Sequence, residues 1–284
     1  MGKIIDIKKL SEIKKENLKK EIKMLSKKNV IPKLAVIIAS SDESSKIYVR
    51  NKKRLCDSLG ILQEEYYFSN TVTTDEILDT IDKLNKDDSV HGILVQLPLY
   101  KHLDEHKILE SIDVRKDVDG FKEINTGRLL LKSKDMIIPC TAKGIMSILE
   151  FIKADISGKH AVIVGRSQIV GKPVSYMLLN NDATVTICHS KTKNLGHYTK
   201  EADILVVVAG VCNLIKKDMV KKGSIVIDVG INKVDGKIYG DVNLQEVIDD
   251  VEYITKVPGG VGVMTVISLI ENLIELVKRS NNIE

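Results

Sequence analysis

The chain has 284 residues, of which 43 are basic and 39 are acidic, with 43% hydrophobic and 4% aromatic content, no tryptophan and four cysteines. A chain of this length buries about three quarters of its unfolded surface and needs no disulfide or metal to hold a core, so we expect two lobes. No apolar run approaches the roughly 18 residues of a membrane-spanning helix, and the charge content argues against disorder. The composition predicts a soluble globular protein.

The positive charge is concentrated at the start of the chain. Residues 1–28 hold ten lysines and four acids, a net of +6, which leaves 33 basic and 35 acidic side chains elsewhere. Apolar residues recur in this segment at roughly helical spacing, which favours a solvated amphipathic helix over a basic arm that grips nucleic acid. The segment also lacks the apolar core of a signal peptide. We therefore expect a cytoplasmic protein with no nucleic-acid or membrane partner.

Apolar runs alternate with helical patterns, which predicts strand–helix–strand units and parallel sheets. The first part of the chain is predicted to contain strands over 34–39 and 92–97, helices over 46–59 and 74–84, and a loop over about 113–139. The second part is predicted to contain a helix over 141–152, strands over 161–164, 183–188, 204–209 and 225–229, and a final helix over 265–278.

A glycine-rich turn follows the strand over 161–164. It begins at Gly165, runs through Arg166 and Ser167 to Gly171, and opens a helix. Gly165 permits a tight turn, and the start of the helix presents unpaired N–H groups to a pyrophosphate. The pattern is G-x-S-x-x-x-G rather than G-x-G-x-x-G and is weak alone, but its position between a strand and a helix predicts a dinucleotide site.

The end of the next strand bears on the choice of cofactor. An NAD site usually has an acid about 20 residues beyond the glycines, whereas this chain has His189, Ser190 and Lys191 there. Arg166 and Ser190 could satisfy a 2′-phosphate, which an acid would repel. We therefore expect NADP rather than NAD.

The first lobe carries a set of candidate reacting groups. Tyr48 and Lys52 are four apart on a predicted helix, so their side chains share one face. Gln96 ends a buried strand, where α/β sheets place ligand-contacting groups, and its amide needs partners. Asp119 precedes Gly120 and is either a turn residue or a ligand-binding group. An amine, an amide, a carboxylate and an aromatic ring together suit a planar, hydrogen-bonding heterocycle.

The histidines and cysteines give no metal pattern. The cysteines are scattered without a C-x-x-C pair, which fits reduced thiols in a core. His102 and His106 share a helical face, but the residues between them do not form H-E-x-x-H. We expect no metal site.

Several motifs, in order, resemble the bifunctional methylenetetrahydrofolate dehydrogenase/methenyltetrahydrofolate cyclohydrolase family. The resemblance extends over about residues 34 to 265, and agreement among independent motifs is far stronger than any one of them. The segments that carry it are Ser45-x-x-Tyr48-x-x-x-Lys52, Val95-Gln-Leu-Pro98, Lys116-Asp-Val-Asp-Gly120, Pro139-Cys-Thr141, Gly165-Arg-Ser-x-Ile-Val-Gly-Lys-Pro173, Ala183-Thr-Val-Thr186 with Cys188-His-Ser-Lys-Thr192, and Pro258-Gly-Gly-Val-Gly262.

The resemblance implies an α/β fold with two lobes. Residues 1–139 would form a catalytic, folate-binding domain to which 264–284 return as a final helix, and residues 140–263 would form a Rossmann-type NAD(P)-binding domain. It also implies a homodimer through the nucleotide lobe. The expected reaction is NADP-dependent oxidation of 5,10-methylenetetrahydrofolate to the methenyl compound, followed by hydrolysis to 10-formyltetrahydrofolate.

Roles for individual residues are also implied by the resemblance. Lys52 would be the acid/base group of the hydrolysis and Gln96 its orienting partner, Asp119 would anchor the pterin N–H groups, and Tyr48 would stack on the ring. The expected substrate-binding set adds Pro258, Gly259 and Gly262, and the expected cofactor-binding set is Gly165, Arg166, Ser167, Ile169, Ser190, Gly210 and Ile231.

The chain departs from the family pattern where proline is usual. Tyr100, Ala142, Lys256 and Val263 stand at those positions, and these changes relax the backbone without removing a reacting group. An alternative is a dehydrogenase of the shikimate type, which would leave Gln96 without a role. A non-catalytic nucleotide-binding module, or an RNA-binding protein that uses the basic first segment, is a further alternative.

Overall fold

The computed structural model describes residues 2–283, with the side chains of 43–48 left undescribed. The described chain divides into two compact units. The three-stranded unit comprises residues 14–128, 134–137 and 269–283. The six-stranded unit comprises residues 2–13, 129–133 and 138–268.

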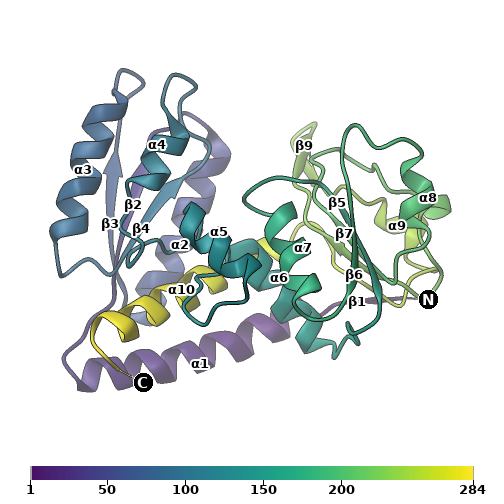
Figure 1. Cartoon of the computed structure of the whole chain (residues 1–284), viewed down its shortest axis with the longest axis horizontal. Coiled ribbons are helices and arrows are strands. Elements are labelled where there is room, and N and C mark those ends of the chain that lie inside the picture. The colour runs from purple at the N-terminus through teal and green to yellow at the C-terminus, as the bar shows by residue number, and fades with distance from the viewer. Residues whose placement is uncertain (1, 284) are drawn as a thin grey trace. The chain divides into compact units, whose positions relative to one another are not determined.

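The helices and strands are those of a mixed α/β protein (Figure 1). The strands are β1 (Lys3–Ile4), β2 (Lys33–Ile38), β3 (Leu62–Tyr67), β4 (Gly92–Gln96), β5 (His160–Val164), β6 (Thr184–Cys188), β7 (Ile204–Val207), β8 (Ile225–Asp228), β9 (Asn232–Val234), β10 (Lys237–Tyr239) and β11 (Tyr253–Ile254). The α-helices are α1 (Ile7–Lys27), α2 (Glu43–Leu59), α3 (Thr74–Lys86), α4 (Glu105–Glu110), α5 (Glu123–Leu130), α6 (Cys140–Phe151), α7 (Gly171–Leu179), α8 (Leu195–Thr199), α9 (Leu244–Val247) and α10 (Val261–Ser280), and Lys217–Met219 form a 3₁₀ turn.

A parallel sheet in the order β3-β2-β4 forms the centre of the three-stranded unit. Alternate residues of β2 and β4, such as Ile37 and Val95, pack on one face against α3 and α4. The opposite face packs against α10, because a Cβ added at Gly92 would lie 2.8 Å from Leu273. Gln96 shares the Gly92 face, since residues two and four apart in a strand point the same way.

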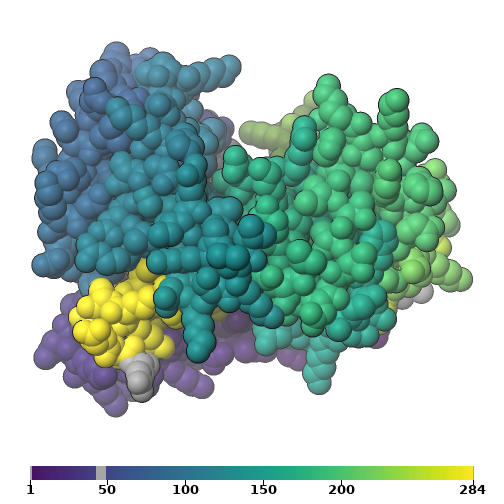
Figure 2. Space-filling view, viewed as in Figure 1, coloured from purple at the N-terminus to yellow at the C-terminus, as the bar shows by residue number. Residues whose placement is uncertain are grey.

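The final helix returns to the three-stranded unit, as predicted. Lys14 and Lys278 form ion pairs with Glu271 (3.1 Å) and Glu21 (2.7 Å), which join α10 to α1. Figure 2 shows the end of the chain in yellow against α1 in purple. The predicted amphipathic helix is α1, which buries Leu10, Leu18 and other apolar residues.

The six-stranded unit is a parallel sheet in the order β1-β11-β8-β7-β5-β6. The chain leaves β5 through α7 to β6 on one side and later forms β7 on the other side, so the strand order reverses at β5. In α/β sheets this switch point, at the carboxyl ends of the strands, is where ligands bind. The Rossmann-type arrangement predicted for this part of the chain is confirmed.

Three features differ from the sequence expectations. Residues 2–13 belong to the six-stranded unit, because β1 pairs in parallel with β11. The expected loop over 113–139 contains α5, and the strand β3 was not predicted. The assignment of folate binding to residues 1–139 remains a prediction.

Three further features of the described residues concern thiols, membrane-spanning helices and metal ligands. All four cysteines are thiols rather than disulfides, and burial raises the pKa of Cys56 to about 12, which makes it a poor nucleophile. Of the helices that the structure describes, none is both long and apolar enough to cross a membrane. The described side chains also contain no group of three or more histidine, cysteine or acidic residues that could hold a metal.

Candidate active site

Lys52 and Gln96 meet in the three-stranded unit. Lys52 lies on α2, Gln96 ends β4, and the Lys52 Nζ donates a hydrogen bond of 3.0 Å to Gln96 Oε1. Both side chains are buried, with exposed fractions of 8% and 9%. The Gln96 Nε2 donates to the Leu97 carbonyl (2.8 Å). This second bond fixes the orientation of the amide, so that its oxygen faces the lysine.

The sheet topology explains why this pair lies at a strand end. The chain crosses from β2 to β3 on one side and then to β4 on the other side, so the strand order reverses at β2. Gln96 is in register with Ile38, the last residue of β2. The pair therefore lies at the carboxyl edge of a parallel sheet, next to a switch point where ligands bind.

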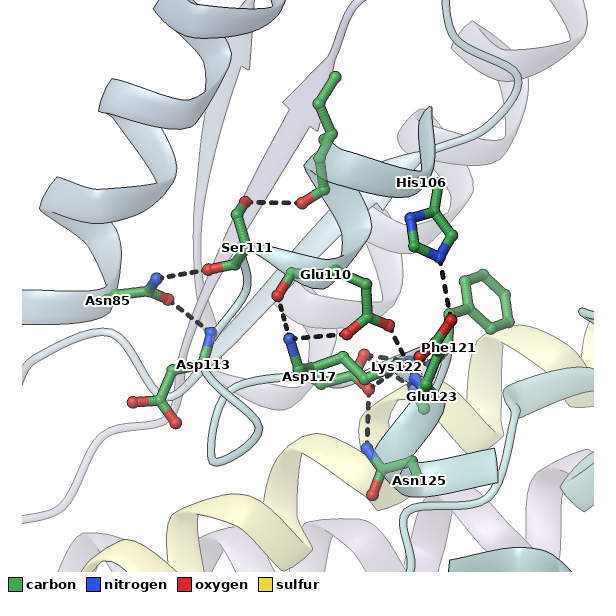
Figure 3. Close-up of polar contacts among 12 residues, drawn as sticks. Asn85, His106, Glu110, Ser111, Asp113, Asp117, Phe121, Lys122, Glu123 and Asn125 are labelled. Atoms are coloured by element: carbon green, nitrogen blue, oxygen red, sulfur yellow. Dashed lines mark hydrogen bonds and ion pairs between the residues drawn. The ribbon is translucent and has the colours of Figure 1, made fainter. Parts of the chain in front are cut away.

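Asp119 lies in a loop that Asp117 shapes from inside the three-stranded unit. Figure 3 shows the Asp117 carboxylate facing the backbone of the following residues and the side chain of Asn125. Its Oδ1 accepts from the N–H groups of Gly120 (3.1 Å) and Phe121 (3.3 Å). Its Oδ2 accepts from the N–H of Lys122 (3.0 Å) and from Asn125 Nδ2 (2.7 Å).

Burial dominates the electrostatics of Asp117. The side chain is 2% exposed, and this loss of solvent raises the pKa of the carboxyl above its ordinary value, although the hydrogen bonds it accepts from Lys122, Asn125 and Phe121 oppose the shift. A buried carboxylate that is surrounded by backbone donors holds a loop in one shape. Sequence reasoning missed this residue.

Two further contacts hold the same loop within this unit. The Asn272 Nδ2 on α10 donates to the Val118 carbonyl at 3.0 Å, directly before Asp119. On the other side, the Lys122 ammonium contacts the main-chain carbonyl and the side chain of Glu110, and the Glu110 carboxylate also accepts from the Glu123 N–H at 2.7 Å (Figure 3). Half-buried Asp119 therefore sits on backbone that is held before and after it.

The other predicted substrate-binding residues are Tyr48 on α2 and three residues of the six-stranded unit. The side chain of Tyr48 lies outside the described residues. Pro258, Gly259 and Gly262 belong to the six-stranded unit, where Pro258 and Gly259 are exposed. Gly259 has a φ of +90°, a backbone conformation that suits glycine.

The predicted nucleotide turn has the tight geometry that its glycines indicate. Gly165 has a φ of +138°, and a Cβ there would lie 2.4 Å from the Val208 carbonyl oxygen. A Cβ at Gly171 would lie 2.3 Å from the Gly165 oxygen. The Gly165 N–H donates to the Cys188 carbonyl (2.8 Å), which ties the turn to the end of β6. The turn therefore brings bare backbone to the switch point at β5, which fits a dinucleotide.

The side chains around this turn are exposed at the carboxyl edge of the sheet. Ser167 Oγ accepts from the Gly171 N–H (3.2 Å) and stabilises the turn before α7. Ile169 and Ile231 are 36% and 51% exposed although they are apolar. The remaining predicted cofactor-binding residues at this edge, Arg166, Ser190 and Gly210, are exposed as well.

The end of β6 carries basic and hydroxyl groups. His189 donates its backbone N–H to Thr192 Oγ1 (2.8 Å), and its Nδ1 accepts from the Lys191 N–H (3.2 Å). These bonds form a compact turn that leaves Ser190 exposed. With Arg166 also exposed, the edge is suited to a 2′-phosphate, which hydroxyl and guanidinium groups bind well.

Comparisons with known proteins identify the family. The model of the tetrahydrofolate dehydrogenase/cyclohydrolase catalytic domain matches residues 5–119, and the model of the NAD(P)-binding domain of the same family matches residues 139–281. The bifunctional protein FolD of Bacillus cytotoxicus is 47% identical over 272 residues, 95% of each chain.

Solved structures agree with this match. The bifunctional FolD methylenetetrahydrofolate dehydrogenase/cyclohydrolase of Campylobacter jejuni is 48% identical with a TM-score of 0.96, over 98% of this chain and 99% of that one. The Trypanosoma brucei enzyme, solved with NADP cofactor and inhibitor, is 34% identical with a TM-score of 0.95, over 99% of this chain and 98% of that one. The chain belongs to the tetrahydrofolate dehydrogenase/cyclohydrolase family.

Proposed function

We propose that Lys52 is the acid/base residue for the second of the two reactions that this bifunctional enzyme catalyses. The enzyme oxidises 5,10-methylenetetrahydrofolate to 5,10-methenyltetrahydrofolate with NADP and then hydrolyses the product to 10-formyltetrahydrofolate. The observation that carries the proposal is the hydrogen bond of 3.0 Å between the buried side chains of Lys52 and Gln96.

The hydrolysis needs a group that moves protons. Water adds to the methenyl carbon and loses a proton, and a ring nitrogen leaves as the formyl group forms. An amine is able to accept the proton from water and return one to the leaving nitrogen. Gln96 accepts a hydrogen bond from Lys52 and is itself held by the Leu97 carbonyl, so it fixes the direction of the lysine side chain. Asp119 would accept hydrogen bonds from the pterin N–H groups and Tyr48 would stack on the ring.

The cofactor residues are proposed on the geometry of the six-stranded unit. When bound, NADP⁺ supplies the hydride acceptor for the oxidation. The backbone at Gly165 would approach the pyrophosphate, Arg166 and Ser190 would bind the 2′-phosphate, and Ser167, Ile169, Gly210 and Ile231 would line the remaining site. Hydride transfer needs no acid or base from the protein, so these residues act by positioning.

The oligomeric state is proposed from the family resemblance. The chain would form a homodimer through the six-stranded unit, in which β6 is an edge strand of the sheet. An edge strand carries backbone donors and acceptors that a second copy is able to pair with.

A dehydrogenase of the shikimate type or a non-catalytic module would leave the Lys52–Gln96 pair without a role.

The test of the catalytic proposal is Lys52→Met. We expect this variant to lose hydrolysis of methenyltetrahydrofolate, followed by the decay of its absorbance, and to keep more of the NADP-dependent oxidation, followed by NADPH formation. Lys53→Met is the matched control, because the Lys53 side chain is 50% exposed and pairs with Glu65 at 3.6 Å. Hydrolysis at the native rate in Lys52→Met would refute the assignment.

A further inference from the structure

Asp241 is a buried carboxylate of the six-stranded unit that no predicted site includes. Its exposed fraction is 0%. Its Oδ2 accepts from the N–H groups of Ala209 (2.6 Å) and Gly210 (2.9 Å), and its Oδ1 accepts from the N–H of Val211 (2.9 Å). Three successive backbone donors thus converge on one carboxylate, which is the arrangement of an anion-binding nest. Here the anion is part of the protein.

The loop that Asp241 holds lies at the switch point of the sheet. Residues 209–211 follow the end of β7, the neighbour of β5. Val208, directly before this loop, donates its N–H to the Val164 carbonyl (2.9 Å), and its own carbonyl oxygen is the atom that a Cβ at Gly165 would meet at 2.4 Å. The backbone directly before the loop after β7 therefore packs against the glycine turn after β5, so the conformation of this loop limits the space at the turn.

Asp241 also holds the loop after β8. The Asn232 Nδ2 donates to Asp241 Oδ1 at 2.8 Å, directly after exposed Ile231. A Cβ added at Gly230 would lie 2.1 Å from Asp241 Oδ1, so this backbone packs against the carboxylate. One side chain thus joins residues 209–211 and 230–232, which carry two of the predicted cofactor-binding residues.

A second buried aspartate fixes Asp241 itself. Asp228, at the end of β8, accepts from the N–H groups of Asp241 (3.0 Å) and Val242 (3.0 Å), and also from the N–H of Gly230 (3.1 Å). Asp228 N–H in turn donates to Thr255 Oγ1 (2.8 Å). The position of the Asp241 carboxylate is therefore determined by the sheet rather than by the loops that it organises.

We propose that Asp241 is a positioning residue for NADP, which holds the loops after β7 and β8 in the shape that receives the cofactor and does not contact the cofactor itself. The proposal rests on the proposed cofactor site at these loops. Asp241 is thus a positioning residue and not a catalytic one, because the contacts of its carboxylate are with backbone N–H groups and with Asn232.

The test is Asp241→Asn in the full chain. Each carboxylate oxygen accepts two hydrogen bonds, so either orientation of an asparagine amide turns an NH₂ group toward two donors. We expect the Kd for NADPH and the KM for NADP⁺ to rise about tenfold or more, as for other losses of a group that orients a binding site. Hydrolysis of methenyltetrahydrofolate without nucleotide should stay within about twofold of the native rate, since that reaction does not use NADP.

Asp203→Asn is the matched control. Asp203 is a half-buried carboxylate of the same unit that accepts from the His160 N–H (2.9 Å) and Lys221 Nζ (2.7 Å), but it precedes β7 and lies at the amino end of the strand. It should lower the thermal midpoint and leave the Kd for NADPH unchanged.

Native NADPH affinity in folded Asp241→Asn would overturn the proposal, and so would a fall in nucleotide-independent hydrolysis as large as the fall in NADPH affinity in the folded variant. If Asp241→Asn does not accumulate as folded protein, Asn232→Ala removes one of the four donors and decides the question by the same measurements, with an expected rise of a few fold in Kd. A native chain that does not bind NADPH would instead refute the proposed cofactor site, and this proposal with it.

Discussion

The loop that carries Asp119 depends on Asp117, and Asp117→Asn tests this dependence. The substitution keeps the size of the side chain and removes its charge. Among the described residues, four donors point at the carboxylate, two at each oxygen. An asparagine amide retains one acceptor oxygen, so two of the four donors would face its NH₂ group.

The expected change in stability follows from these contacts. A buried N–H without an acceptor costs about 1–3 kcal/mol, so two such groups cost about 2–6 kcal/mol. Burial raises the pKa of the Asp117 carboxyl, which means that its charged form is penalised in the folded protein, and a neutral amide avoids that penalty. We therefore expect a loss near the lower limit, about 2 kcal/mol, or about 4–8 °C in the thermal midpoint.

The assay combines thermal unfolding with kinetics. Because Asp119 lies on the affected loop, the KM for methenyltetrahydrofolate should rise about tenfold while the Kd for NADPH stays unchanged. Asp113→Asn is the control, since Asp113 accepts mainly from Arg115, whose side chain is 78% exposed, and such surface pairs contribute less than about 1 kcal/mol. A thermal midpoint within about 1 °C of the native value, together with a native KM, would refute the reasoning.

Two further predictions concern the six-stranded unit. Burial raises the pKa of Asp228 to about 6, whereas an unfolded aspartate titrates near 3.9. The folded state therefore binds this proton more tightly, and the contribution of Asp228 to stability is full below about pH 4 and is lost, by about 3 kcal/mol in total, as the pH rises through about 6. Urea unfolding of the native chain and Asp228→Asn should show the native-minus-variant difference decreasing between about pH 4.5 and about pH 7.5, and a constant or rising difference would contradict this. Sedimentation equilibrium should give twice the 31.6 kDa of one chain, and the mass of one chain at micromolar concentration would exclude the homodimer.

Much of the fold could be predicted because the central strands are buried on both faces. The predicted strand over 34–39 and the observed β2 agree to within one residue at each end, since a continuous apolar run leaves little ambiguity. β3 was missed because its sequence LQEEYY has no apolar alternation. As an edge strand, it is not enclosed by neighbours on both sides and tolerates Glu64 and Glu65.

The helix α5 shows a different limit of prediction. It contains Asn125 and Gly127, which are poor helix formers, so the sequence favoured a loop there. In the structure Asn125 is 0% exposed and donates to Asp117. This contact between side chains eight residues apart stabilises the start of the helix and cannot be read from helix propensity.

The candidate site was predictable where it depended on strand ends. Gln96 was expected at the carboxyl end of a strand and Lys52 on the face of a helix that also carries Tyr48, and the structure brings Lys52 Nζ to 3.0 Å from Gln96 Oε1. Asp117 was missed because an aspartate that binds backbone and one that binds a ligand have the same residue type. Their spacing gave no signal either, since residues two apart in an extended segment point the same way. Asp117 forms an isolated parallel bridge with Ile93 of β4, and this pairing between distant parts of the chain is a feature of the fold alone.

Asp117 and Asp241 represent the same structural solution in two separate units. Each is almost fully buried, and each accepts two hydrogen bonds at both oxygens from the described residues around it. Burying a carboxylate is costly, and at each aspartate this cost is opposed by three backbone donors and one asparagine side chain, which must lie in one arrangement. An alanine would leave those donors without partners, so the loop would lose its shape rather than a contact with the ligand. Because each carboxylate accepts these hydrogen bonds from groups of its own unit, the folate-side and cofactor-side effects should be independent and additive.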